Sequence, residues 1–264
     1  MIKVVVNGIG GRMGRLIAQT IIEDSQLELL AGIEGDNSPC IGKRVKESLN
    51  LNSEALIYKN IEDIKEDNFT IVDFTFPEVT LNLLEKIKDK NVKLVIGTTG
   101  FSEEELEKIK EISKNIPIVL DYNMSLGVNL LAKLVEYAAS KLSLDYEVEI
   151  TEIHHRYKKD SPSGTAIKLA EAVLRGRGEK EKPFVYGRYG KGLSRDYKEI
   201  GIHAIRGGDV VGEHDVMFIT EGERIIISHK AHSRMAFVKG VIAAIKFLSD
   251  KNNGFYRMYD VLGL

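Results

Sequence analysis

The first half of the chain alternates short apolar runs with longer segments whose apolar residues recur at helical spacing. Runs rich in Val, Ile and Leu predict strands at residues 3–7, 27–33, 70–74, 92–96 and 116–120. One helical stripe is formed by Met13, Leu16, Ile17 and Ile21. Further helices are predicted at 79–89 and 102–113, and Ser102 with Glu105 has the spacing of a capping box. This alternation predicts a parallel sheet with helices on its faces.

The pattern changes after about residue 125. We expect helices at 125–141, 161–174 and 235–248, and strands at 146–153, 201–206, 210–219 and 224–229. Gly207-Gly208 and Glu221-Gly222 favour hairpin turns between the last three strands. Residues 35–59 are expected to be a loop region with one short helix, and residues 175–199 a long loop. The sequence therefore predicts an α/β domain followed by an α+β domain with a largely antiparallel sheet.

Composition narrows the classes of protein that fit. The chain has 264 residues, with 37 Lys and Arg against 39 Asp and Glu, so its net charge of −2 argues against nucleic-acid binding. No apolar run approaches the roughly 18 residues of a membrane span, and the apolar start is too short for a signal peptide. The single cysteine, Cys40, cannot form an internal disulfide. We therefore expect a cytoplasmic protein without a membrane or nucleic-acid partner.

A glycine-rich segment between the first strand and the first helix predicts a dinucleotide site. It contains Gly8, Ile9, Gly10, Gly11, Arg12, Met13 and Gly14. Such a turn lets a pyrophosphate approach the helix N-terminus with no Cβ in the way. Glu34 lies 20 residues after Gly14, where an acid accepts hydrogen bonds from a ribose. Gly35 follows it in place of an arginine, which favours NADH, while Arg12 and Arg15 leave NADPH open.

A second glycine-bounded segment, Gly97-Thr98-Thr99-Gly100, follows a later predicted strand. Ligands in such folds bind at the carboxyl ends of the parallel strands, so we expect the two hydroxyls to face the nicotinamide. The alternative is an ordinary strand-to-helix turn.

All six histidines lie in the second half of the chain, and two of them open the most informative segment, residues 154–165. His154 and His155 are adjacent on a strand and point to opposite faces, and no nearby Cys or carboxylate completes a plausible metal set, so no metal is expected. Ser161 is expected to cap the following helix, with Pro162 at its first position. The N–H groups of Ser163, Gly164 and Thr165 then form a carboxylate cradle at the positive helix end.

Positive charge beside this cradle suits proton donation to an anionic substrate. Lys158 and His155 supply that charge. The alternative is a well-capped helix that follows a polar loop, with chance clustering of histidines. Arg206 is expected in a hairpin turn, and Arg234 either pairs with a carboxylate or holds an interface.

These residues together resemble the dihydrodipicolinate reductase family over nearly the whole chain. The resemblance rests on residues 10–14, 73–75, 97–100, 123–129, 154–165, 207–214 and 233–235. It implies a Rossmann-like nucleotide domain and an α+β substrate and oligomerisation domain with a mixed, largely antiparallel sheet. It further implies that the last helix returns to the first domain, giving residues 1–125 and 235–264 for nucleotide binding and 126–234 for substrate binding and assembly.

The resemblance also implies an activity. Members reduce 4-hydroxy-tetrahydrodipicolinate to tetrahydrodipicolinate with NADH or NADPH, in lysine and diaminopimelate biosynthesis. It assigns proton donation to Lys158 and assistance to His154. Substrate contacts are implied for His155, Ser163, Gly164, Thr165 and Thr99. Cofactor contacts are implied for Gly8, Ile9, Gly10, Gly11, Arg12, Met13, Glu34, Gly97, Thr98, Thr99, Asp121, Tyr122, Asn123 and Met124. A homotetramer is implied as well.

Three departures from the family pattern affect these expectations. Gly35 and Phe76 stand where members often carry an arginine, which weakens the case for NADPH preference, and Asp121-Tyr122 replaces a more usual Ala-Pro. Two alternatives to the reductase are a related two-domain dehydrogenase that acts on an amino acid, and a regulator that binds NAD(H) without turnover.

Overall fold

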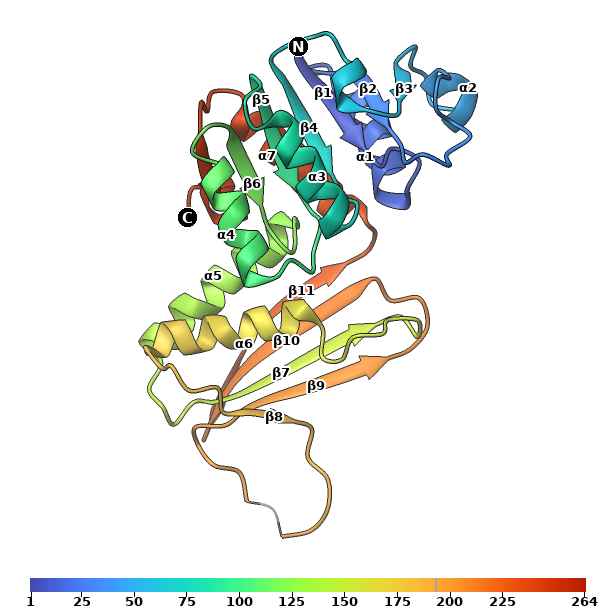
Figure 1. The fold of residues 1–264 in the computed structure, drawn as a ribbon. Helices are drawn as coiled ribbons and strands as arrows, with labels where there is room; N and C mark the ends of the chain where they lie inside the picture. The colour runs from blue at the N-terminus through green and yellow to red at the C-terminus, as the bar shows by residue number, and fades with distance from the viewer. Residues whose placement is uncertain (193) are drawn as a thin grey trace. The chain divides into compact units, whose positions relative to one another are not determined.

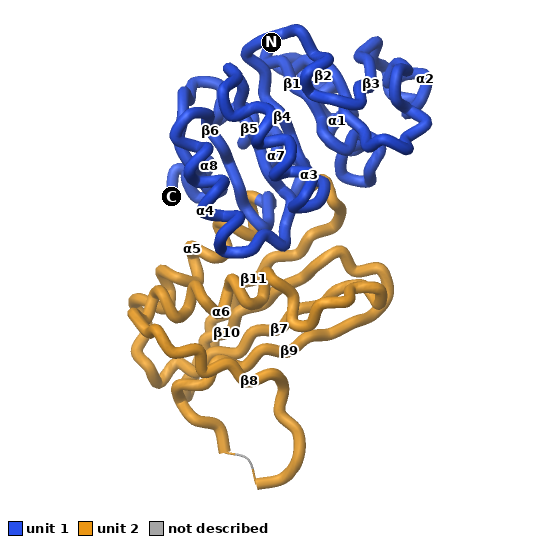
Figure 2. The backbone as a smooth tube through the Cα atoms, viewed as in Figure 1, with its two compact units in different colours: residues 1–125, 237–264 blue, residues 126–236 orange. Residues whose placement is uncertain are grey.

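The computed structural model describes residues 1–192 and 194–264 (Figure 1). These residues form two compact units (Figure 2). Unit 1 comprises residues 1–125 and 237–264, and unit 2 comprises residues 126–236. Among the described residues, no helix is both long enough and apolar enough to cross a membrane.

Unit 1 is built on a seven-stranded sheet in which every neighbouring pair is parallel. Its order is β12-β6-β5-β4-β1-β2-β3. The strands are β1 (Ile2–Asn7), β2 (Leu27–Ile33), β3 (Leu56–Tyr58), β4 (Phe69–Asp73), β5 (Val92–Ile96), β6 (Pro117–Leu120) and β12 (Gly254–Tyr256). The helices are α1 (Arg12–Glu23), α2 (Val45–Leu49), α3 (Pro77–Ile87), α4 (Glu103–Ile112), α7 (Met235–Leu248) and α8 (Met258–Leu262), with a 3-10 turn at Ile61–Asp63.

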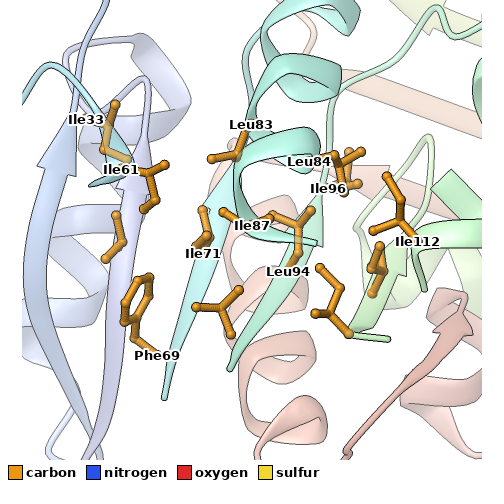
Figure 3. Packing of buried hydrophobic residues seen from close by; sticks show 14 of the residues in the cluster. Ile33, Ile61, Phe69, Ile71, Leu83, Leu84, Ile87, Leu94, Ile96 and Ile112 are labelled. Carbon is orange, nitrogen blue, oxygen red and sulfur yellow. The ribbon is translucent and has the colours of Figure 1, made fainter. Parts of the chain in front are cut away.

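The core of unit 1 forms where helices pack on this sheet. Leu83, Leu84 and Ile87 of α3 lie against Ile71 of β4 and Leu94 of β5 (Figure 3). The central strands read as continuous apolar runs because helices cover a parallel sheet on both faces. The capping box predicted at Ser102 is confirmed, since its hydroxyl accepts from the Glu105 N–H. The Rossmann-like fold class is confirmed.

Unit 2 carries a five-stranded mixed sheet in the order β11-β10-β7-β9-β8. Its strands are β7 (Glu147–His154), β8 (Phe184–Tyr186), β9 (Ile200–Arg206), β10 (Gly212–Thr220) and β11 (Glu223–Ala231). Helices α5 (Leu126–Lys141) and α6 (Gly164–Arg177) pack together and cover one face (Figure 1). Alternate residues of β7, from Val148 to His154, are buried under these helices. The intervening residues of each strand point to the opposite face of the sheet.

One of the two hairpin turns predicted for this sheet needs correction. Gly207-Gly208 is not a hairpin turn, because β9 pairs in parallel with β7 and not with β10. The segment instead crosses the end of β7, where the Gly207 N–H donates to the His154 carbonyl at 3.0 Å. The hairpin at Glu221-Gly222 is confirmed between β10 and β11.

The expected loops also contain more regular structure than the sequence predicted. Strand β3 lies in the 35–59 region, and the 175–199 region contains β8 and the last residues of α6; Leu193 lies outside the described residues. Strands β3, β8 and β12 have three residues each, too few to display a period. Their pairing with longer neighbours stabilises them.

Candidate active site

In unit 1, the segments predicted to bind a cofactor all follow sheet strands. The glycine-rich segment follows β1, Glu34 follows β2, Thr98 and Thr99 follow β5, and residues 121–124 follow β6. Since these strands are parallel, their carboxyl ends lie at one edge of the sheet, which is where such folds bind ligands.

The glycine-rich turn has the geometry that a nucleotide phosphate requires. Gly8 has φ +73°, a conformation that side chains rarely adopt. A Cβ on Gly14 would lie 2.1 Å from the Gly8 carbonyl oxygen, so only glycine lets α1 approach the turn this closely. Gly11 is the N-cap of α1 and supplies no side-chain cap. The first turn of α1 therefore presents backbone N–H groups, as an anion site does.

Glu34 lies directly against this turn. Its Oε1 accepts a hydrogen bond from the Gly10 N–H at 2.5 Å. Next to it, a Cβ on Gly35 would meet nothing within 4 Å, so this position leaves open space beside the acid. The arrangement places a carboxylate beside the phosphate-binding turn, where ribose hydroxyls are bound in dinucleotide folds.

Buried Asp73 organises the loops after β4 and β5. Its carboxylate accepts hydrogen bonds from Thr75 Oγ1 at 2.6 Å, Thr80 Oγ1 at 2.5 Å and Asn7 Nδ2 at 3.3 Å. Burial raises the pKa of Asp73, and these hydrogen bonds oppose that shift. Thr98 is also buried, and its hydroxyl accepts from the Thr75 N–H at 3.0 Å. The Thr98 hydroxyl is therefore engaged inside unit 1.

The remaining unit 1 residues divide between buried and exposed positions. Thr99 and Tyr122 are exposed, whereas Asp121 and Met124 are buried. Asp121 accepts hydrogen bonds from the N–H groups of Asn123 and Met258, each at 3.3 Å. Thr99 and Tyr122 are thus the members of these two segments most open to a ligand.

In unit 2, the start of α6 differs from the sequence prediction. Ser163, not Ser161, is the N-cap, and its hydroxyl accepts from the Ala166 N–H. The helix begins at Gly164, so Pro162 lies outside it. The Ser163 N–H donates to Glu152 Oε1 at 2.9 Å and does not belong to an open cradle. Gly164 is exposed, and a Cβ there would meet nothing within 4 Å.

Glu152 is the centre of a buried ionic cluster that sequence analysis missed. Its side chain has no exposed surface and receives both Arg206 Nη atoms, at 2.7 and 2.8 Å. Its Oε2 lies 2.5 Å from His154 Nδ1. Burial raises the pKa of Glu152, but the hydrogen bonds from Arg206 and His154 outweigh burial and hold the pKa below its usual value. Glu152 is therefore ionised at neutral pH.

The histidines beside this carboxylate are neutral. Burial lowers the pKa of His154, and the hydrogen bond to Glu152 opposes this only in part. His214 is 3 % exposed, and burial lowers its pKa to about 3. Its Nε2 lies 3.2 Å from Ser163 Oγ, and its ring packs edge-on against His154 at a centroid distance of 5.2 Å. The N-cap of α6 and His154 thus share one polar cluster.

Lys158 lies on the segment between β7 and α6, with its side chain 21 % exposed. Its Nζ forms an ion pair with Asp160 Oδ1 at 2.9 Å. His155 follows His154, and its ring lies 6.2 Å from the Tyr157 ring. Arg234, the other candidate, is exposed. No group of three or more His, Cys, Asp or Glu that could hold a metal occurs among the described residues.

One of the missed residues had a signal in the sequence. Glu152 precedes His154 by two positions on a predicted strand, so both side chains point to the same face. Arg206 had no such signal, because its position depends on the pairing of β7 with β9. His214 lies opposite Glu152 only through the pairing of β7 with β10.

Comparisons with known proteins identify one family. Residues 2–124 match the family model described as dihydrodipicolinate reductase, N-terminus, and residues 127–262 match the C-terminus model. Proteins named 4-hydroxy-tetrahydrodipicolinate reductase from Methanocaldococcus jannaschii and Nitrosospira multiformis are each 44 % identical, over 100 % of this chain and 98 % of their own.

Solved structures agree with this family match. The dipicolinate-bound dihydrodipicolinate reductase from Paenisporosarcina sp. TG-14 is 27 % identical with a TM-score of 0.78, over 98 % of each chain. Myo-inositol dehydrogenase from Lactobacillus casei has a TM-score of 0.61 at 13 % identity, over 99 % of this chain and 90 % of its own, and shares the fold alone.

Proposed function

Because this chain belongs to the dihydrodipicolinate reductase family, we propose that it reduces 4-hydroxy-tetrahydrodipicolinate to tetrahydrodipicolinate with NADH or NADPH, in lysine and diaminopimelate biosynthesis. The observation that supports this function most strongly is the match over the full chain to relatives named 4-hydroxy-tetrahydrodipicolinate reductase. Within it, the segment from His154 to Thr165 joins the end of β7 to the start of α6. A dicarboxylate substrate suits a helix N-terminus flanked by a lysine.

The nucleotide is assigned to the carboxyl edge of the unit 1 sheet. Gly8, Gly10 and Gly11 with the start of α1 would hold the pyrophosphate, and Glu34 the adenosine ribose. The further contacts are Ile9, Arg12, Met13, Gly97, Thr98, Thr99, Asp121, Tyr122, Asn123 and Met124. A bound reduced nicotinamide supplies the hydride. Since Gly35 and Phe76 bring no cation for a 2′-phosphate, NADH is favoured, with NADPH as a second donor.

Substrate binding and protonation are assigned to unit 2. Lys158 is the proton donor, and its Nζ forms an ion pair with Asp160 on the same segment before α6. His154 assists, while His155, Gly164 and Thr165 hold the carboxylates and Ser163 lies at the start of the same helix. Thr99 of unit 1 is assigned a further substrate contact. The exposed backbone of Gly164 at the first position of α6 supports this assignment, because a carboxylate can approach it closely.

The experiment is NADH oxidation followed by absorbance, with the substrate generated in situ by its synthase. Lys158→Ala is expected to lower turnover by ~10²-fold or more, as loss of a general acid does. Lys159→Ala is the matched control, since Lys159 is the exposed neighbour and is expected to keep turnover within about threefold. The same traces with NADPH give the cofactor preference.

Two outcomes would overturn this function. Folded protein that binds NADH but does not turn over the substrate excludes the reductase and favours the regulator or a related dehydrogenase. Parent-like turnover in Lys158→Ala excludes Lys158 as the proton donor.

We also propose a homotetramer, assembled through the sheet of unit 2, in the cytoplasm. Ile205 of β9 and Ile226 of β11 are 45 % and 47 % exposed, and the strand register places both on the face away from α5 and α6. Exposed apolar side chains on such a face support contact with a further copy. Sedimentation velocity measures the mass, and a monomer at micromolar concentration would contradict assembly.

A further inference from the structure

We propose that Glu152 is a positioning residue that holds His154 and the start of α6 in a fixed relation. The inference rests on the proposed function and adds a residue to it. Glu152 uses both carboxylate oxygens: Oε2 binds His154 Nδ1, and Oε1 binds the Ser163 N–H. One side chain thereby joins the end of β7 to the N-cap of the substrate-binding helix.

The hydrogen bond to His154 selects the form of its ring. An ionised carboxylate can only accept, so the neutral His154 ring carries its proton on Nδ1. Its Nε2 then holds a lone pair and can accept a proton or a hydrogen bond. A Cβ on Gly212 would lie only 3.0 Å from this Nε2, so glycine at that position avoids a tight contact with the atom.

Arg206 keeps Glu152 charged and ties in a third part of the site. Its guanidinium binds the carboxylate through two nitrogens, which is the geometry that best stabilises an ionised acid. Arg206 Nη2 also donates to the Asp160 carbonyl at 2.8 Å, and the Asp160 side chain pairs with Lys158. The segment that bears Lys158 is therefore anchored to the same carboxylate.

The substitution that tests this role is Glu152→Gln, which keeps the shape and removes the charge. A glutamine has one acceptor oxygen and an NH₂ group, so it cannot accept from both His154 and Ser163. In one orientation the NH₂ group donates to His154 Nδ1, which moves the His154 proton to Nε2. In the other orientation the NH₂ group faces the Ser163 N–H, which then loses its hydrogen-bond acceptor. Both arrangements disturb one part of the site.

We expect kcat to fall roughly 10- to 100-fold and the KM for substrate to rise, the effect of losing a hydrogen bond to a buried charge. The KM for NADH should stay unchanged. A purely structural role would reduce the fraction of active enzyme, which lowers kcat and leaves both KM values alone. The ¹³Cδ2 shift of His154 and the amide shift of Ser163 report the two arrangements directly.

The matched control is Glu136→Gln. Glu136 lies on α5 and is also held by cations, with Arg175 Nε at 3.1 Å and Lys133 Nζ at 3.2 Å, but it belongs neither to the Glu152 cluster nor to the sheet. It should retain kcat within about threefold. An equal loss of kcat in the control would overturn the proposal, because any disrupted Glu–Arg pair in unit 2 would then suffice.

Parent-like kcat and substrate KM in Glu152→Gln, or unchanged His154 and Ser163 signals, would also overturn it. If that variant does not fold, Glu152→Asp is the second variant. It keeps a carboxylate for Arg206 but is too short to reach both His154 and Ser163. Parent-like kinetics in Glu152→Asp would also overturn the proposal. Failure of the parent enzyme to turn over would refute the proposed reaction. The two NMR signals would still test the position of Glu152 independently.

Discussion

Helix α6 has two glycines whose replacement by alanine should have opposite effects. A Cβ on Gly164 meets nothing within 4 Å, and its φ is not positive. A Cβ on Gly176 would lie 2.2 Å from the Glu136 carbonyl oxygen of α5 and 2.8 Å from the Ala139 Cβ. The first site is open to solvent, whereas at the second site the backbones of the two helices lie too close together for a side chain.

The expected changes in stability follow from this geometry. Gly164→Ala should leave the free energy of unfolding unchanged or raise it by about 0.4–1 kcal/mol, because alanine restricts the unfolded chain. Gly176→Ala gains about 1 kcal/mol of helix propensity but forces the two backbones apart, at a cost near the upper end of the ~1–3 kcal/mol typical of overpacking. The net loss of about 2 kcal/mol corresponds to a fall in Tm of about 4–8 °C.

For substrate binding we expect the reverse order, with the larger effect in Gly164→Ala and the smaller effect in Gly176→Ala. In Gly164→Ala, the methyl group occupies the space in which a substrate carboxylate approaches the helix start. Loss of one charge-assisted hydrogen bond, worth about 1.5–3 kcal/mol, should raise the KM for substrate roughly 10- to 150-fold. Gly176→Ala should keep the parent KM at temperatures where it is folded.

The assays are thermal unfolding and steady-state kinetics on both variants. A parent-like KM for substrate in Gly164→Ala would refute the carboxylate site at the start of α6. Destabilisation of Gly164→Ala by more than about 1 kcal/mol would refute the open geometry from which its stability is argued.

Two further predictions concern unit 1 and the histidine cluster. Gly14→Ala should abolish NADH binding, measured by fluorescence titration, and lower Tm, since its Cβ would lie 2.1 Å from the Gly8 carbonyl; tight binding would contradict the close approach. For His214, the folded-state pKa of about 3 lies below the value of 6.5 for an unperturbed histidine, so its contribution to stability is lost as pH falls below 6.5. When the pH falls from 6.5 to 5, the free energy of unfolding should therefore decrease by roughly 2 kcal/mol less in His214→Gln than in the parent. Equal decreases, measured by urea titration, would contradict this.

The sequence by itself determined the elements that have a strong local period. The central strands of unit 1 were predictable because burial on both faces makes them continuously apolar. The first turn was predictable because both a positive φ at Gly8 and the close approach at Gly14 demand glycine. The segment from His154 to Thr165 was recognisable because its residue types lie together in the chain.

Only the tertiary structure decided which strands are neighbours and which polar groups meet. Strand β7 lies between β9 and β10, so the glycines after β9 form a crossover and not a hairpin. That order brings Arg206 and His214 to Glu152, and Glu152 in turn engages Ser163, which becomes the cap that Ser161 was expected to be. Local patterns encode the face on which a side chain lies, whereas partners distant in sequence are selected by the packing of whole elements.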